Sequence, residues 1–227
     1  MAQELSDHIH DDRIIRISSS RKLTDMGWTV FASKGFLAEY RKGKQIASID
    51  LRKCTALQGT HNHQNACAAY AAVRAMGIGP REIEKAFFSF TGLPHRSQLV
   101  REIGGVVFIN DSKATNIDSA IKALLTYPNI RWICGGQQKE GDISRINKAL
   151  VNVQKAYVIG ADSAGYSNQI SCDYEICNTM DMAVKSAFRD AKKGDTILLA
   201  PAAASFDQFS SFEERGETFE SEVIKLM

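Results

Sequence analysis

The sequence predicts an α/β fold whose larger, C-terminal part is a doubly wound, mostly parallel sheet. Short, continuous apolar runs alternate with amphipathic stretches after residue 94, which is the pattern of strands covered by helices on both faces. Hydrophobic residues make up 44% of the chain and charged residues 24%, as in ordinary globular proteins. The pattern changes at Gly92-Leu93-Pro94, so we expect two domains, 1–92 and 93–227.

The first domain is expected to begin with strands and continue with helices. Gly35 and Gly43 are placed for hairpin turns between strands. An alanine-rich segment predicts a helix over 65–76, and Pro80, a favoured first-turn residue, predicts another to about Phe90. The strands are expected at residues 14–18, 30–33, 36–40 and 46–51.

The second domain is expected to alternate strand and helix, as Rossmann-like sheets do. The predicted strands cover residues 105–110, 131–134, 156–159, 174–177 and 196–201. The predicted helices cover residues 116–127, 144–153, 179–193 and 212–227. Ligands of such sheets bind beyond the carboxyl ends of the strands, and the sequence places polar residues there.

Composition excludes several classes of protein. The net charge of +2 and the scattered lysines and arginines give no support for nucleic-acid binding. The apolar stretch 196–204 is about half of what a membrane span needs, and the acidic N-terminus is no secretory signal. Five cysteines without zinc spacing indicate a reducing, cytoplasmic setting.

Polar side chains cluster in four segments of the second domain. In the first, Leu93-Pro94-His95-Arg96, an arginine follows a rigid proline, and its planar cation suits phosphate, although a surface arginine would look the same. In the second, Asp111 can accept hydrogen bonds from hydroxyls and Lys113 can meet an anion. Thr115 or Asn116 can cap the helix that follows, whose free N–H groups attract anions.

The remaining two segments also follow predicted strands. Gly135-Gly136 lets backbone or a ligand approach closely, and Lys139 behind it could clamp a carboxylate, although a plain loop fits equally well. Residues 200–204 are small, which predicts a tight turn with accessible backbone N–H groups before Ser205. Phe206 and Phe212 could line a pocket there. A serine nucleophile is a poor interpretation, because the G-x-S-x-G elbow is absent.

Taken in chain order, these segments resemble the Mur ligase family, and most closely its D-glutamate-adding member. The similarity runs from about Gly59 to the end, through HNHQN, GLPHR, FINDSKATN, GGQQKEGD and APAAASFDQFSSFEERG. FINDSKATN followed by ASFDQF and FEERG is the most specific part. The resemblance implies that 1–92 are the partial end of an α/β ATPase central domain and that 93–227 are a Rossmann-like, amino-acid-binding ligase domain.

The resemblance also implies an activity, with its ligands. With ATP and Mg²⁺, the family converts a substrate carboxylate to an acyl phosphate, here that of UDP-N-acetylmuramoyl-L-alanine, which D-glutamate then attacks during peptidoglycan synthesis in the bacterial cytoplasm. Matched positions imply that Asn65 contacts adenine and that Arg96 and Asp111 hold ribose and phosphates, with Lys113 near the chemistry but no catalytic residue in this chain. The implied D-glutamate contacts are Thr115, Lys139, Ser205, Phe206 and Phe212.

The sequence departs from the family pattern in its first half. No Gly-Lys-Ser or Gly-Lys-Thr phosphate loop occurs, since Gly43-Lys44 leads to Gln45, and the family's magnesium ligands, carbamylated lysine and UDP-binding domain have no counterpart. Ala200, Ala203 and Phe206 replace serine, cysteine and leucine that are common in relatives. We therefore expect this chain to be the C-terminal half of the ligase, to be a monomer, and to be inactive in isolation. The alternatives are a non-catalytic D-glutamate- or nucleotide-binding module and, more weakly, a dinucleotide-dependent enzyme.

Overall fold

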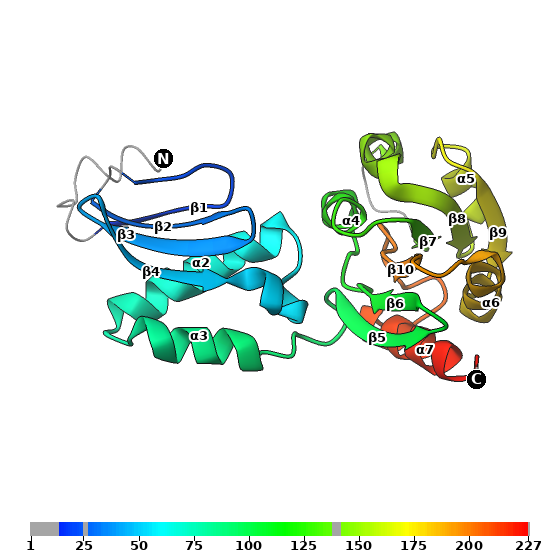
Figure 1. Ribbon diagram of the computed structural model, residues 1–227. Coiled ribbons are helices and arrows are strands. Elements are labelled where there is room, and N and C mark those ends of the chain that lie inside the picture. The colour runs from blue at the N-terminus through cyan, green and yellow to red at the C-terminus, as the bar shows by residue number, and fades with distance from the viewer. Residues whose placement is uncertain (1–13, 25–26, 138–141, 227) are drawn as a thin grey trace. The chain divides into compact units, whose positions relative to one another are not determined.

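The chain forms two compact units, Met1–Thr91 and Gly92–Met227, which are described separately (Figure 1). The computed structural model describes residues 14–24, 27–137 and 142–226. The predicted α/β fold class with a mostly parallel sheet is confirmed by the six-stranded sheet of the second unit. In the described ranges, no helix has both the length and the apolar character that crossing a membrane requires.

The first unit is a four-stranded sheet in the order β1-β2-β3-β4 with helices packed against it. β1 runs parallel to β2, and the remaining neighbours are antiparallel hairpins. Gly35 and Gly43 both have positive φ, as the two hairpin turns require. Its elements are β1 Ile15–Ser18, β2 Trp28–Ser33, β3 Phe36–Arg41, β4 Lys44–Asp50, η2 Leu51–Lys53, η3 Thr55–Leu57, α2 Thr60–Ala75 and α3 Pro80–Ser89.

Helix α2 begins five residues before the predicted start at residue 65. Its first turn is polar, so no apolar period marks it in the sequence, and the Asn62 side chain instead donates to the Gln58 carbonyl at 2.9 Å. Cys67 and Tyr70, both fully buried, pack α2 against the sheet. The face that holds this unit together therefore lies where the alanine-rich pattern predicted it.

The second unit has the strand order β5-β6-β10-β7-β8-β9. Every neighbouring pair is parallel except β5 and β6, which are antiparallel. The strands are β5 Gln98–Ile103, β6 Val106–Asn110, β7 Ile130–Gly135, β8 Val153–Ile159, β9 Tyr174–Asn178 and β10 Thr196–Leu199. β10 therefore returns between β6 and β7, and the carboxyl ends of these three strands are neighbours.

Helices cover both faces of this sheet, as a doubly wound fold requires (Figure 1). One apolar cluster joins the sheet to α4, η4 and α5, and another joins it to α6 and α7. The helices are α4 Ile117–Leu124, η4 Ile143–Asn152, α5 Ser163–Ser167, α6 Met180–Asp190 and α7 Phe212–Ile224. The helix predicted at 144–153 is present as the 3₁₀ helix η4, which begins where the Asp142 side chain accepts from the Ser144 N–H at 2.9 Å.

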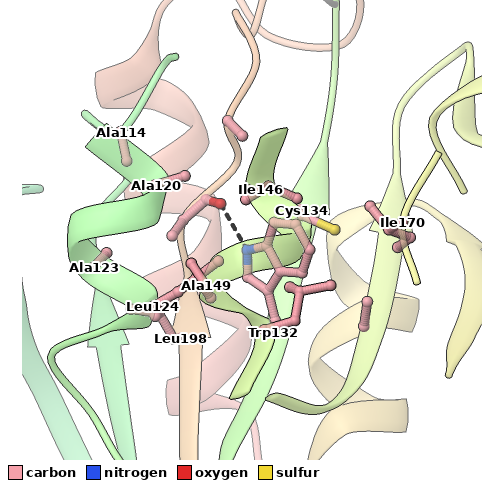
Figure 2. Packing of buried hydrophobic residues seen from close by; sticks show 14 of the residues in the cluster. Ala114, Ala120, Ala123, Leu124, Trp132, Cys134, Ile146, Ala149, Ile170 and Leu198 are labelled. Carbon is pink, nitrogen blue, oxygen red and sulfur yellow. Dashed lines mark hydrogen bonds between the residues drawn. The ribbon is translucent and has the colours of Figure 1, made fainter. Parts of the chain in front are cut away.

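Trp132 of β7 is the largest fully buried side chain (Figure 2). Leu124 of α4, Ile146 of η4 and Leu198 of β10 belong to the same apolar cluster. The indole N–H donates to the Ala200 carbonyl at 2.8 Å, just beyond the end of β10. The core thus fixes the start of the segment that carries Ser205, and replacing such a buried Trp by Ala typically costs about 3–5 kcal/mol.

Candidate functional site

The second, third and fourth of the polar segments meet at one edge of the sheet. They follow β6, β7 and β10, which are parallel neighbours. Backbone hydrogen bonds join the segments directly: the Ala202 N–H donates to the Ala114 carbonyl at 2.9 Å, and the Gly135 N–H donates to the Pro201 carbonyl at 3.0 Å. The predicted site is therefore assembled from residues that are far apart in the sequence.

Asp111 comes directly after β6, and its own N–H is bonded to the Leu199 carbonyl of β10. Its carboxylate accepts the Ser97 N–H at 3.2 Å. Burial raises the pKa of Asp111 to about 6, against the opposing effects of the Ser97 N–H and the nearby Arg96. Arg96 itself is exposed. Asp111 is thus a carboxylate held in place by backbone and able to accept hydrogen bonds.

Lys113 extends its ammonium over the ring of Phe212, with Nζ 3.7 Å from the ring centroid. The contact is a cation–π interaction that fixes a long, flexible side chain. The Lys113 N–H donates to the His95 carbonyl at 3.0 Å, which joins the second segment to the first. Asn116 caps helix α4 by accepting from the Ser119 N–H, as predicted, and Thr115 lies partly buried beside the cap.

The glycines at the end of β7 let two backbone segments approach. Gly135 and Gly136 have φ of 107° and 126°, and a Cβ on either would meet a carbonyl oxygen, that of Ile159 or Ala204. Beyond them, Gln137 and Ala204 exchange two backbone hydrogen bonds of 2.9 Å. The groups that closely approach Gly135 and Gly136 are therefore backbone carbonyls of neighbouring segments. Lys139 lies outside the described residues.

The segment after β10 is more closed than the sequence suggested. The N–H groups of Ala202 and Ala204 are bonded to the carbonyls of Ala114 and Gln137, so the expectation that these N–H groups are accessible was wrong. Ser205 is buried, with 2% of its surface exposed. Phe206 exposes 69% of its surface. Phe212 lies under Lys113.

Arg215 of α7 was not singled out in the sequence, yet it joins two of the segments. Its Nε and Nη2 donate to the hydroxyl and carbonyl of Ser112 at 3.0 Å each, and Nη1 donates to the Ala203 carbonyl at 3.1 Å. The side chain is 1% exposed, and burial lowers the pKa of Arg215 to about 10. The signal available was the arginine of FEERG, but local pattern does not separate a buried arginine from an exposed one.

The remaining predicted residue, Asn65, belongs to the first unit, where it is exposed on α2. Across the described part of the chain, no group of three or more His, Cys, Asp or Glu side chains is arranged to hold a metal ion.

Comparison with known proteins gives a consistent result. Residues 95–203 match the family model of the Mur ligase, glutamate ligase domain. The chain is 59% identical over 227 residues to the UDP-N-acetylmuramoylalanine–D-glutamate ligase of Ruegeria pomeroyi, and 57% identical to that of Roseobacter denitrificans. Each match covers 100% of this chain and 49% of the relative, so the chain spans about half the length of these relatives.

Solved structures share the fold. The UDP-N-acetylmuramate–alanine ligase of Thermotoga maritima superimposes with a TM-score of 0.63 at 16% identity, over 90% of this chain and 47% of that one. FolC of Escherichia coli, solved with DHPP and ADP, gives 0.61 at 21% identity, over 88% and 47%. The family predicted from the sequence is confirmed. Residues 95–203 match the glutamate ligase domain of the Mur ligase family, and the whole chain aligns with about half the length of ligases of that family.

Proposed function

We propose that the second unit is the amino-acid-binding part of an ATP-dependent ligase that joins D-glutamate to UDP-N-acetylmuramoyl-L-alanine in peptidoglycan synthesis. The observation that carries the proposal is the 59% identity, over the whole chain, to a relative of that name. The gathering of polar segments at one sheet edge supports it, because ligands of such sheets bind there.

The proposed D-glutamate contacts supply donors suited to carboxylates. Thr115 and the buried Ser205 offer hydroxyls in the assembled segments, and Phe212 offers an aromatic ring, over which the Lys113 ammonium lies. Charge-assisted hydrogen bonds of this kind are roughly twice as strong as neutral ones. Lys139 and Phe206 remain proposed contacts on the strength of the family resemblance, with Phe212 acting through Lys113 as well as directly.

Nucleotide contacts are proposed for Asn65, Arg96, Asp111 and Lys113. ATP supplies the phosphoryl group that activates the substrate carboxylate. The carboxylate of Asp111, fixed by the Ser97 N–H, can accept a hydrogen bond from a ribose hydroxyl, and Arg96 can bind phosphate oxygens. The sequence carries no phosphate-binding loop, so we propose that this chain alone does not catalyse ligation.

A chimera tests the proposal. Replacing the matching part of the Ruegeria pomeroyi ligase by this chain should give an enzyme that forms ADP and the D-glutamyl product from ATP, UDP-N-acetylmuramoyl-L-alanine and D-glutamate. This chain alone, under the same conditions, should form neither. A folded chimera that uses another amino acid in preference to D-glutamate would contradict the proposed specificity, and ligation by the chain alone would contradict the proposed inactivity.

A further inference from the structure

Asn110, the last residue of β6, is a fully buried polar side chain at the base of the site. Its Nδ2 lies 3.2 Å from the Gly216 carbonyl and 2.8 Å from Glu220 Oε1, both on α7. The same nitrogen lies 3.0 Å from Nδ1 of His95. Asn110 therefore connects the sheet, α7 and the segment that carries Arg96.

The orientation of the Asn110 amide is fixed by its other end. Oδ1 accepts the Ser112 N–H at 3.0 Å. If the amide were reversed, its NH₂ group would face the Ser112 N–H, and its oxygen would face the Gly216 carbonyl and Glu220. Reversal would thus replace hydrogen bonds by contacts between like groups, so Nδ2 is the atom that faces His95.

This orientation determines where His95 carries its proton. An amide NH₂ donates and does not accept, so the Nδ1 atom that faces it must be an acceptor. The charged group nearest to Nδ1 on α7 is Glu220, whose Oε1 is 3.9 Å away and is bonded to Asn110 instead. The contact with the amide NH₂ therefore favours the tautomer of His95 that carries its proton on Nε2. Gly216 makes this packing possible, because a Cβ there would overlap Nδ1.

The neutral ring matters for the neighbouring site. His95 meets Phe212 edge-on, with ring centroids 6.1 Å apart. Phe212 carries the Lys113 ammonium at 3.7 Å from its centroid. A cationic imidazole on the same ring would repel that ammonium and would lose its bond to Asn110, so both effects would release Lys113 from the ring.

We propose that Asn110 is a positioning residue: by holding His95 neutral with its proton on Nε2, it keeps Lys113 over Phe212, ready to meet an anionic substrate. The link to a substrate rests on the proposed function. The protonation of His95 and the placement of Lys113 do not, and they can be measured without ligand or turnover.

The first experiment observes His95 directly. Long-range ¹H–¹⁵N NMR of this chain, above the ordinary pKa of imidazole, should show a pure Nε2–H pattern for His95, assigned from its disappearance in His95→Gln. Asn110→Asp keeps an acceptor for the Ser112 N–H but turns a carboxylate toward Nδ1, so Nδ1 should gain a proton in addition to the one on Nε2 and the ring should become cationic. Glu220→Gln keeps the acceptor to Asn110 and should leave the pattern unchanged. A proton on Nδ1 in the unaltered chain, or no change in folded Asn110→Asp, would overturn the proposal.

The second experiment observes Lys113. Its side-chain protons over the Phe212 ring should be shifted upfield, and Phe212→Leu should abolish the shift. Asn110→Asp should reduce the shift toward the Phe212→Leu value, whereas Glu220→Gln should preserve it. If His95 changes its proton in Asn110→Asp while the Lys113 shift stays at its original value, Asn110 does not position Lys113. Because no activity is measured, an inactive chimera with these NMR results intact would contradict only the proposed function.

Discussion

Both units bury a charged side chain, but they compensate it in opposite ways. In the first unit, Glu39 is fully buried on β3 and accepts hydrogen bonds from Trp28 Nε1, Tyr70 and the guanidinium groups of Arg41 and Arg74. Burial raises its pKa, but the bonds from Arg74 and Tyr70 outweigh burial, and the pKa of Glu39 lies below its ordinary value. The charge is thus well matched by cations.

In the second unit, the buried charge of Arg215 is not compensated by an oppositely charged side chain among the described residues. Its guanidinium donates to a hydroxyl and to two carbonyl oxygens, and no carboxylate of the described residues lies within ion-pair distance. Burial accordingly lowers its pKa, against a smaller opposing effect of Asp207. The residues it binds, Ser112 and Ala203, belong to the segments of the proposed site.

The difference separates two uses of a buried charge. Glu39 is surrounded by partners from β2, β3 and α2, so it stabilises the packing of one unit. Arg215 hydrogen-bonds to two of the segments that follow strands, but its buried charge has no carboxylate partner among the described residues. A buried charge without a counterion is unfavourable, and we expect it to be retained mainly where it preorganises a site. Substitution of either Glu39 or Arg215 should therefore destabilise its unit, but only substitution of Arg215 should disturb the proposed site.

Arg215→Ala should have the largest effect. It removes three hydrogen bonds and a buried volume, so we expect a loss of roughly 3–5 kcal/mol in the free energy of unfolding. Arg215→Met keeps most of the volume and should lose less. Urea unfolding followed by Trp132 fluorescence in a Trp28→Phe background would measure both. Equal losses in the two variants would contradict this expectation and would show that the lost hydrogen bonds, and not the lost volume, account for the effect.

Glu39→Gln should cost about 3 kcal/mol, because two arginines lose their buried counterion. Since the folded pKa is lowered, the stabilisation by Glu39 is present above its unfolded pKa and is lost as the pH falls through the folded value. Unfolding followed by Trp28 fluorescence in a Trp132→Phe background should show both the loss and its disappearance in acid. A loss that is constant down to low pH would argue against an ionised Glu39.

Asp111→Asn should stabilise the second unit at neutral pH. The folded pKa of about 6 lies above the unfolded value, so the folded state binds more protons and stability falls as the pH rises from about 4 to 6. The substitution should therefore increase the free energy of unfolding by at most about 3 kcal/mol above about pH 6, and should not change it below about pH 4. Thermal unfolding at a series of pH values tests this, and a gain of the same size at every pH would refute the assigned cause.

Phe206→Leu should have the smallest effect on stability. The side chain is 69% exposed, and substitutions at such positions usually change stability by less than about 0.5 kcal/mol. The same unfolding assay would measure it. A loss above about 1 kcal/mol would indicate that Phe206 is packed against other side chains in solution and is not exposed.

Sequence reasoning predicted the parallel sheet because buried parallel strands such as β7 are continuous apolar runs that periodicity reveals. It missed β5, an antiparallel edge strand whose Arg101 and Glu102 interrupt any apolar pattern. It found the strand-end segments because polar residues follow each strand. It could not find the contacts of Arg215, since these depend on α7 returning to β6, more than 100 residues away in the chain. It also could not find the Asn110–His95 contact, because local pattern does not show which side chains meet across 15 residues.

The central claim is that the assembled strand ends bind D-glutamate, and Ser205 tests it most directly. In the chimera with the Ruegeria pomeroyi ligase, Ser205→Ala should raise the KM for D-glutamate roughly 10- to 100-fold, the loss of one hydrogen bond to a charged group, while the KM for ATP stays unchanged. Ser210→Ala, at an exposed serine outside the proposed contacts, is the matched control and should leave the D-glutamate KM unchanged. An unchanged KM for D-glutamate in folded Ser205→Ala would contradict the claim.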